Sequence, residues 1–374
     1  MKKILIVYAQ AGNGHKRAAF AVKEAFNALQ PNTEVACVDI LLYFSFLYKK
    51  IYELNYLFFS EYIPSIYNLF YNFFESKQAG RLFRDILEML ESLQSKKFKK
   101  LVETMKPDII ISTHFLTPHA LSSIKDKTWR GKQIMIMTDY GHHAIWTHPL
   151  IDHYFVATPE LKNTLAQNFD IPSSSITASG IPISQAFNKT LARDHFQKKY
   201  NLNPQYKTLL FLSGRLSNLD LIRYIKKMIN NKSAYNIIAI CGTNYSLKEK
   251  LKKLSPKGKN NFLVLGFVKN MEDWMNISDI IITKPGGLTL SEGSSLEKPF
   301  ILISPVPKQE QKNAEFFRQK GAATIIRNEE ELELILEDIF HSPAKLQNMS
   351  KASRKLGRVE ASRQIVEEII KLER

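Results

Sequence analysis

Apolar residues along this chain occur in short continuous runs, separated by longer stretches with the spacing of helices. Six runs rich in β-branched residues lie in the first half and five in the second, at 3–9, 34–40, 108–112, 133–138, 154–158 and 176–180, then at 208–213, 235–241, 262–267, 279–283 and 300–304. Runs of this kind, joined by helices, are typical of parallel strands buried on both faces of a sheet. The pattern therefore predicts two doubly wound α/β domains.

The length of the chain agrees with two domains. Its 374 residues exceed the roughly 250 to 300 at which a single hydrophobic core usually stops growing. We expect a first domain over residues 1–185 and a second over 200–342, with a polar stretch between them. Residues 343–374 are predicted to form helices, of which the last packs back on the first domain.

Cysteine content and hydropathy limit the class of protein. Cys37 and Cys241 lie far apart inside apolar runs, which excludes a disulfide scaffold and a Cys-rich zinc site. A reducing, cytoplasmic compartment is expected. The sequence has no run of 18 apolar residues, so no transmembrane helix is predicted.

Charge is uneven along the chain, which carries a net +16. Residues 1–187 hold 20 basic and 16 acidic side chains, and the remainder holds 32 and 20. Ten basic residues and one acid lie within 223–259, a balance that attracts anionic membrane or nucleotide, although a solvated lysine-rich surface is an equal alternative. No helix-turn-helix, RNP or zinc-finger pattern accompanies the charge, so nucleic acid is not an expected partner.

One segment departs from the strand and helix pattern. Residues 41–74 hold 14 of the 41 aromatic side chains of the chain. A helix that covers a domain should show a polar face, and none is visible here. Because Tyr is apolar with a polar tip, such density favours contact with a membrane or lipid. An ordinary aromatic core is the alternative.

A glycine-containing loop follows the first predicted strand. In AQAGNGHKRAA, residues 9–19, the turn leads into a helix whose first N–H groups can hold an anion, and His15 would open that helix. A tight turn explains Gly12 and Gly14 but gives no reason for His15. The loop is neither GxGxxG nor a Walker sequence, which argues against a dehydrogenase or a P-loop NTPase.

The second half contains a stronger pattern, TKPGGLTLSE at residues 283–292. The strand ends near Lys284, Gly286 and Gly287 let the backbone approach a ligand, and the helix that follows can hold a diphosphate. Glu292 falls about two turns into this helix, where a carboxylate can accept hydrogen bonds from a ribose diol. A glycine turn with a solvent-facing glutamate is the alternative. Gln309 and Glu310 lie on another strand-to-helix loop, a suitable place for side chains that read hydroxyl groups.

Six ordered motifs resemble a known family over roughly residues 3–370. They are AGNGHKRAA, MTDYGHHAIWTHPLID, SGIPI, GFV, TKPGGLTLSE and PVPKQEQKNAEFF. They look like the diacylglycerol glycosyltransferases of bacteria and the galactolipid synthases of plants, which share a superfamily with the muramyl-lipid N-acetylglucosaminyltransferases. The resemblance implies an α/β GT-B fold of two doubly wound, Rossmann-like domains that face a central cleft. It also implies inverting, metal-independent transfer from a UDP-hexose to diacylglycerol, without a cofactor, at the cytoplasmic face of the membrane.

The resemblance carries roles to individual residues. On the acceptor side it implies a loop formed by Gly12, Asn13 and Gly14, followed by His15 as the reactive or phosphate-facing histidine. It also implies that Asp139 and His143 belong to a second motif beside the acceptor. On the donor side it implies contacts to the diphosphate, ribose, hexose and uracil: Ser213, Gly214, Gly286, Gly287, Leu288, Thr289, Glu292, Gln309, Glu310, Phe267 and Val268. No metal ligands are expected. The membrane contact is expected from residues 41–74 and nearby basic side chains.

Several alternatives stay open at this point. The muramyl-lipid transferases are a second enzyme candidate, but they have a longer glycine-rich first loop and lack the TD..HH..W.H pattern. A non-catalytic UDP-sugar sensor is a third, although both His15 and Asp139 are present. We expect His15 to be the base and Asp139 to be the alternative. Glucose and galactose differ in one hydroxyl orientation, which the sequence does not distinguish.

Overall fold

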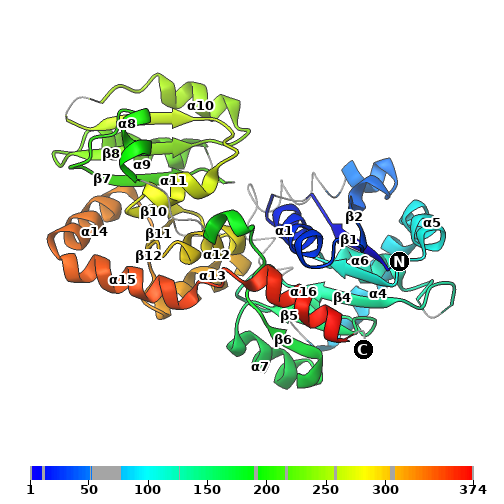
Figure 1. Cartoon of the computed structure of the whole chain (residues 1–374). Helices are drawn as coiled ribbons and strands as arrows, with labels where there is room; N and C mark the ends of the chain where they lie inside the picture. Colours follow the sequence, from blue (N-terminus) through cyan, green and yellow to red (C-terminus); the bar gives the residue numbers. More distant parts are fainter. Residues whose placement is uncertain are drawn as a thin grey trace. The chain divides into compact units, whose positions relative to one another are not determined.

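The protein divides into two compact units, each built on a parallel sheet (Figure 1). The computed structural model describes residues 2–10, 13–50, 52, 77–125, 127–188, 193–214, 218–256, 259–303 and 308–372. The first unit comprises Met1–Gln185, Val306–Gln309 and Arg358–Arg374. The second comprises Ala186–Pro305 and Glu310–Gly357.

The sheet of the first unit has six parallel strands in the order β2-β1-β3-β4-β5-β6. Its strands are β1 (Lys3–Tyr8), β2 (Glu34–Asp39), β3 (Ile109–Ser112), β4 (Lys132–Ile136), β5 (His153–Val156) and β6 (Ile176–Ala178). Strand β1 pairs with β2 on one side and with β3 on the other, with Ile4 opposite Ile109. All residues of β3 and β5 are buried, as the continuous apolar runs predict.

Helices cover both faces of this sheet. They are α1 (Asn13–Leu29), α4 (Lys77–Gln94), α5 (Lys96–Met105), α6 (Leu116–Leu121), α7 (Pro159–Asn168) and α16 (Ala361–Leu372), with short 3₁₀ turns η1 (Ile40–Leu42), η2 (Ala144–Trp146) and η3 (Ser173–Ser175). On one face α1 and α16 pack together, with Phe26 and Ile365 in the same core cluster as Ile4. Phe98 of α5 and Leu116 of α6 pack on the other face with Leu5.

The second unit repeats this plan with the strand order β12-β11-β10-β7-β8-β9. Its strands are β7 (Lys207–Leu212), β8 (Tyr235–Ile240), β9 (Asn261–Leu265), β10 (Ile280–Thr283), β11 (Phe300–Ile303) and β12 (Ala323–Ile326). Its helices are η4 (Gln185–Asn188), α8 (Arg193–Lys199), α9 (Asn218–Ile229), α10 (Tyr245–Lys252), α11 (Met271–Ile277), α12 (Gly287–Ser295), α13 (Lys308–Gln319), α14 (Glu329–His341) and α15 (Pro343–Leu356). Helices α9, α10 and α14 share one core cluster with alternate residues of the strands.

The two doubly wound sheets confirm the predicted fold class, and each of the eleven predicted strands is present. The sequence pattern missed β12, a strand of four residues that pairs with β11 at the edge of the second sheet. This strand follows Gly321, whose φ is +76°, and only half of its residues are buried, so its apolar signal is weak. The predicted polar stretch between the domains contains η4 and helix α8.

Most of the aromatic segment at 41–74 lies outside the described residues, namely 51 and 53–74. In the described part, Leu41 and Phe44 are buried in the core beside η1. Leu42, Phe46 and Leu47 are exposed. No helix among the residues that the structure describes is long and apolar enough to cross a membrane.

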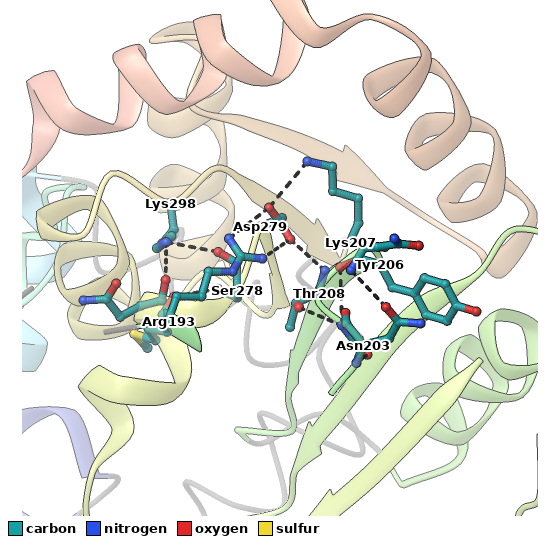
Figure 2. Close-up of polar contacts among 12 residues, drawn as sticks. Arg193, Asn203, Tyr206, Lys207, Thr208, Ser278, Asp279 and Lys298 are labelled. Carbon is teal, nitrogen blue, oxygen red and sulfur yellow. Dashed lines mark hydrogen bonds and ion pairs between the residues drawn. The ribbon is translucent and has the colours of Figure 1, made fainter. Parts of the chain in front are cut away.

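Polar contacts join the amino ends of β7 and β10 in the second unit, as Figure 2 shows. Asp279 accepts hydrogen bonds from Arg193 Nη2 at 2.9 Å and from the Thr208 amide at 2.7 Å. Beside them, Lys298 Nζ donates to the backbone oxygens of Asn276 at 2.6 Å and Ser278 at 3.0 Å. These contacts lie at the opposite end of the strands from the ligand-binding edge of such sheets, which gives the cluster a structural role.

The buried lysine makes the stability of the protein depend on pH. Burial lowers the pKa of Lys298 from 10.5 to about 8. Between these values the unfolded chain binds a proton that the folded chain has lost, so the free energy of unfolding rises with pH in this window. Relative to Lys298→Met, we expect wild-type protein to gain about 2 kcal/mol between pH 8 and about pH 10, measured by urea unfolding. The exposed Lys351→Met is the control. Parallel pH curves for wild type and Lys298→Met would contradict this expectation.

Candidate active site

In each sheet the strand order reverses beside the first strand of the unit. In the first unit the reversal lies between β1 and β3, and in the second between β7 and β10. Ligands of doubly wound folds bind outside the carboxyl ends of the strands at such a reversal. The predicted site residues follow these strands in both units.

His15, the third residue of α1, is held from several sides. Its Nδ1 lies 3.0 Å from the hydroxyl of Thr138, just beyond the end of β4. The hydroxyl of Thr113, directly after β3, donates to the His15 backbone oxygen at 3.0 Å. The ring lies 4.9 Å from the ring of His114 and 5.9 Å from that of Trp146. The half-buried imidazole therefore has a defined orientation at the carboxyl edge of the sheet.

Two other predicted residues lie in the segment after β4. Asp139 follows Thr138 directly and is 7% exposed. It accepts a hydrogen bond from the side-chain amide of Gln309, the second residue of α13. The first two residues of α13 count with the first unit, and the rest of the helix counts with the second. His143 is buried, and its Nδ1 accepts a hydrogen bond from the Ile145 amide at 3.1 Å, so it caps η2.

The first-strand loop is only partly described. Gly12 lies outside the described residues. Asn13 is the first residue of α1 and is exposed, and Gly14 is half-buried. The first N–H groups of a helix have no intrahelical acceptor, so the start of α1 is suited to an anion or a hydroxyl group.

Residues after β7 and β10 come together in the second unit. Ser213 is buried, and Gly214 has a φ of +49°, which a side chain would strain. A Cβ atom at Gly214 would also lie 3.1 Å from Cε of Lys284. Lys284 forms an ion pair with Glu310 of α13. A single cluster thus joins the two strand ends to α13.

The predicted diphosphate loop forms the start of α12. Gly286 is the N-cap residue, and the helix begins at Gly287 and continues through Leu288 and Thr289. A Cβ atom at Gly286 would meet no atom of the described residues within 4 Å. Glu292 lies further along α12 and is 2% exposed, so the alternative of a solvent-facing glutamate is wrong.

Phe267 and Val268 lie apart from this cluster. They follow β9, the outer strand of the second sheet, while the cluster follows β7 and β10. The side chain of Phe267 is exposed. The predicted donor residues therefore follow β7, β9, β10 and β11 of the second sheet.

Sequence reasoning missed several residues that position the predicted ones. Thr113, His114 and Thr138 all contact His15. Thr113 and His114 follow the predicted strand at 108–112, and Thr138 is the last residue of the predicted strand at 133–138. This position at the carboxyl end of a strand was the signal that could have identified them. Within the described residues, no group of three or more His, Cys, Asp or Glu side chains could hold a metal ion.

Comparison with known proteins assigns the chain to a family. The monogalactosyldiacylglycerol (MGDG) synthase model matches residues 15–183, and the glycosyltransferase family 28 C-terminal domain model matches residues 208–369. Processive diacylglycerol beta-glucosyltransferases of Bacillus cereus (strain ATCC 10987 / NRS 248) and Bacillus cytotoxicus are each 31% identical. In both cases the match covers 98% of this chain and 93% of the relative. The chain belongs to the diacylglycerol glycosyltransferase family.

Solved structures show that this diacylglycerol glycosyltransferase family member shares the GT-B fold. MurG of Acinetobacter baumannii superposes with a TM-score of 0.64 at 15% identity, covering 99% of this chain and all of that one. MnaA of S. aureus, solved with UDP, gives a TM-score of 0.67 at 15% identity, covering 99% of this chain and 96% of that one. At this identity the likeness concerns the fold.

The cap formed by His143 allows its structural and chemical roles to be separated in this glycosyltransferase. His143→Ala removes the acceptor for the Ile145 amide, so we expect a loss of about 1 kcal/mol in the free energy of unfolding. An asparagine oxygen can replace Nδ1, so His143→Asn should keep wild-type stability in urea unfolding. Loss of turnover in a stable His143→Asn protein would assign a chemical role to its Nε2. Equal destabilisation by both variants would contradict the capping role.

Proposed function

We propose that this protein transfers a hexose from a UDP-hexose to 1,2-diacylglycerol, and that His15 accepts the proton of the acceptor hydroxyl. Family membership over nearly the whole chain supports the substrates. The observation that carries the role of His15 is its place at the strand reversal of the first sheet, with Nδ1 against the Thr138 hydroxyl. Relatives named as beta-glucosyltransferases favour glucose as the hexose.

The proposed reaction needs a base and a site for a departing anion. As the diacylglycerol oxygen attacks the anomeric carbon of the hexose, its proton passes to Nε2 of His15. The bond between that carbon and the diphosphate oxygen breaks, and UDP leaves with the electron pair. Nδ1–H donating to Thr138 would keep the lone pair on Nε2, as in other histidine bases whose second nitrogen is oriented by a partner.

The second unit supplies groups suited to the departing diphosphate. The start of α12 presents backbone N–H groups at Gly287, and the described residues leave the side of Gly286 uncovered. Lys284 lies two residues before Gly286, and its positive charge can offset that of the anion. In this proposal α12 and Lys284 stabilise the leaving group, and Asp139 is the alternative base in the first unit.

Helix α4 supports peripheral attachment to a membrane, because two of its glutamates bond to buried histidines while several of its apolar side chains are exposed. Glu91 Oε2 lies 2.6 Å from Nδ1 of buried His119, and Glu88 Oε2 lies 3.2 Å from Nε2 of buried His148. The exposed large apolar side chains repeat at helical spacing, as Ile86, Met89, Leu90 and Leu93. At these six positions the arrangement is the opposite of that in a helix that covers a soluble core.

Basic side chains follow the apolar face of α4 along the chain. Lys96, Lys97 and Lys100 of α5 are exposed, whereas Lys99 Nζ donates to the Ser92 backbone oxygen. Apolar insertion and attraction to anionic lipid together give stable, reversible binding. We propose that this surface, with Leu42, Phe46 and Leu47, contacts an anionic membrane at its cytoplasmic face.

The activity can be tested directly. Purified protein is incubated with diacylglycerol vesicles and either labelled UDP-glucose or labelled UDP-galactose, and the lipids are separated by chromatography. We expect a labelled glycolipid, with faster formation from UDP-glucose. Release of free sugar without a labelled lipid, or absence of reaction with both donors, would overturn the proposed function.

The donor site depends on Glu292 in this proposal. Removing a buried charged acceptor from ribose should weaken UDP binding by about 1.5 to 3 kcal/mol in Glu292→Ala, measured by calorimetry. Glu297→Ala is the matched control, since Glu297 follows the same helix and pairs on the surface with Arg354. Unchanged UDP affinity in a folded Glu292→Ala protein would remove Glu292 from the site.

Membrane binding should depend on the outward face of α4. We expect Leu90→Ser with Leu93→Ser to lower cosedimentation with anionic vesicles by about tenfold, because two apolar side chains no longer insert. Leu334→Ser, in an exposed position of the second unit, is the control. Added salt should also weaken binding. Wild-type sedimentation of the doubly substituted protein would contradict the role of this face.

A further inference from the structure

His114 lies directly against the proposed base and is itself buried. It follows β3 with one residue between, and it is 2% exposed. Its ring meets that of His15 edge to face, with centroids 4.9 Å apart and planes at 87°. A second imidazole so close to His15 could compete for the same proton, so its protonation state matters for the reaction.

Hydrogen bonds select one neutral tautomer of His114. The Leu116 amide donates to Nδ1 at 3.3 Å, which requires a lone pair on that nitrogen. The proton of the neutral ring therefore lies on Nε2, 3.2 Å from the hydroxyl oxygen of Tyr52. A charged His114 would carry a proton on Nδ1 facing the Leu116 amide, and both groups would then be donors.

The surroundings of His114 agree with a neutral ring. Among the described residues, the titratable side chains that face it are His15 from α1, Tyr52, and His119 from α6. Burial, with His15 and His119 nearby, lowers the pKa of His114 well below its usual range. Protonation of His15 and of His114 is mutually unfavourable, so a ring held neutral leaves the proton to His15.

The contact from Tyr52 is itself supported by neighbours. The rings of Tyr52 and Tyr48 stack with centroids 6.0 Å apart. The Tyr48 hydroxyl donates to Glu91 Oε1 at 2.8 Å, and Glu91 Oε2 lies 2.6 Å from Nδ1 of His119. Tyr48, bonded to Glu91 of α4, therefore holds the Tyr52 ring beside His114 by stacking on it.

We propose that His114 is a positioning residue for His15, held in its Nε2–H tautomer by the Leu116 amide and the Tyr52 hydroxyl. In this role it packs the His15 ring in place without taking the transferred proton. The inference rests on the proposed function of His15 as the base.

Histidine NMR tests the tautomer without any substrate. The protein is labelled with ¹⁵N in histidine, and the His114 signals are assigned by their loss in His114→Asn. We expect His114 to remain neutral with the proton on Nε2 from about pH 5.5 to about pH 8, the range in which ordinary histidines titrate. Titration of His114 in this range, or a proton on its Nδ1, would overturn the proposal. A failure here is distinct from the absence of transferase activity.

Kinetics test the positioning. Tyr52→Phe removes one hydroxyl, and we expect kcat to fall at least about threefold while the KM for UDP-hexose stays within about twofold. His114→Asn keeps an acceptor for the Leu116 amide, but the asparagine side chain does not reach Tyr52. Because each single substitution already removes the contact between the two side chains, the Tyr52→Phe/His114→Asn protein should turn over no more slowly than the slower single variant. Tyr43→Phe, whose ring packs on Phe98, is the matched control. Wild-type kcat in Tyr52→Phe, additive losses in the double variant, or a change in KM alone would overturn the proposal.

Discussion

The chemistry of this protein depends on the constraint that a buried parallel sheet places on polar groups. Strands covered on both faces leave room for polar side chains where the strands end. Neighbouring strands lie about 4.8 Å apart, so residues that follow adjacent strands become neighbours in space. His15 and Thr138 are far apart in the sequence, yet the ends of β1, β3 and β4 bring them within hydrogen-bond distance. The same constraint brings Gly214 beside Lys284 in the second unit.

The histidines of the first unit differ in role because their Nδ1 atoms have different hydrogen-bond partners. In His114, His143 and His148 a backbone amide two residues ahead donates to Nδ1, which makes each of them a turn or cap residue. In His15 the Nδ1 atom meets a hydroxyl group instead, and a hydroxyl can accept as well as donate. This difference separates the proposed base from its neighbours more clearly than burial does.

The fold was largely predictable because the apolar runs that build parallel strands are local in the sequence. Strand β12 was not predicted, because an edge strand with two half-buried residues has little apolar signal in the sequence. Positions after strands, such as His15 and Gly286, could be identified as candidates in the same way. Their partners could not, since the contacts of Thr138 with His15 and of Lys284 with Glu310 depend on side-chain conformation and strand order. The inward direction of Glu88 and Glu91 on α4 likewise depends on buried histidines elsewhere in the chain.

The most direct test of the account is the turnover of His15→Asn, compared with Asp139→Asn, at saturating UDP-hexose and diacylglycerol. UDP affinity is measured on the same samples. If His15 accepts the proton, its variant should lose about 10²-fold or more in kcat and keep wild-type UDP affinity, because α12, Lys284 and Glu292 lie in the other unit. If His15→Asn keeps most of its turnover while Asp139→Asn is inactive, Asp139 is the base and the central claim is wrong.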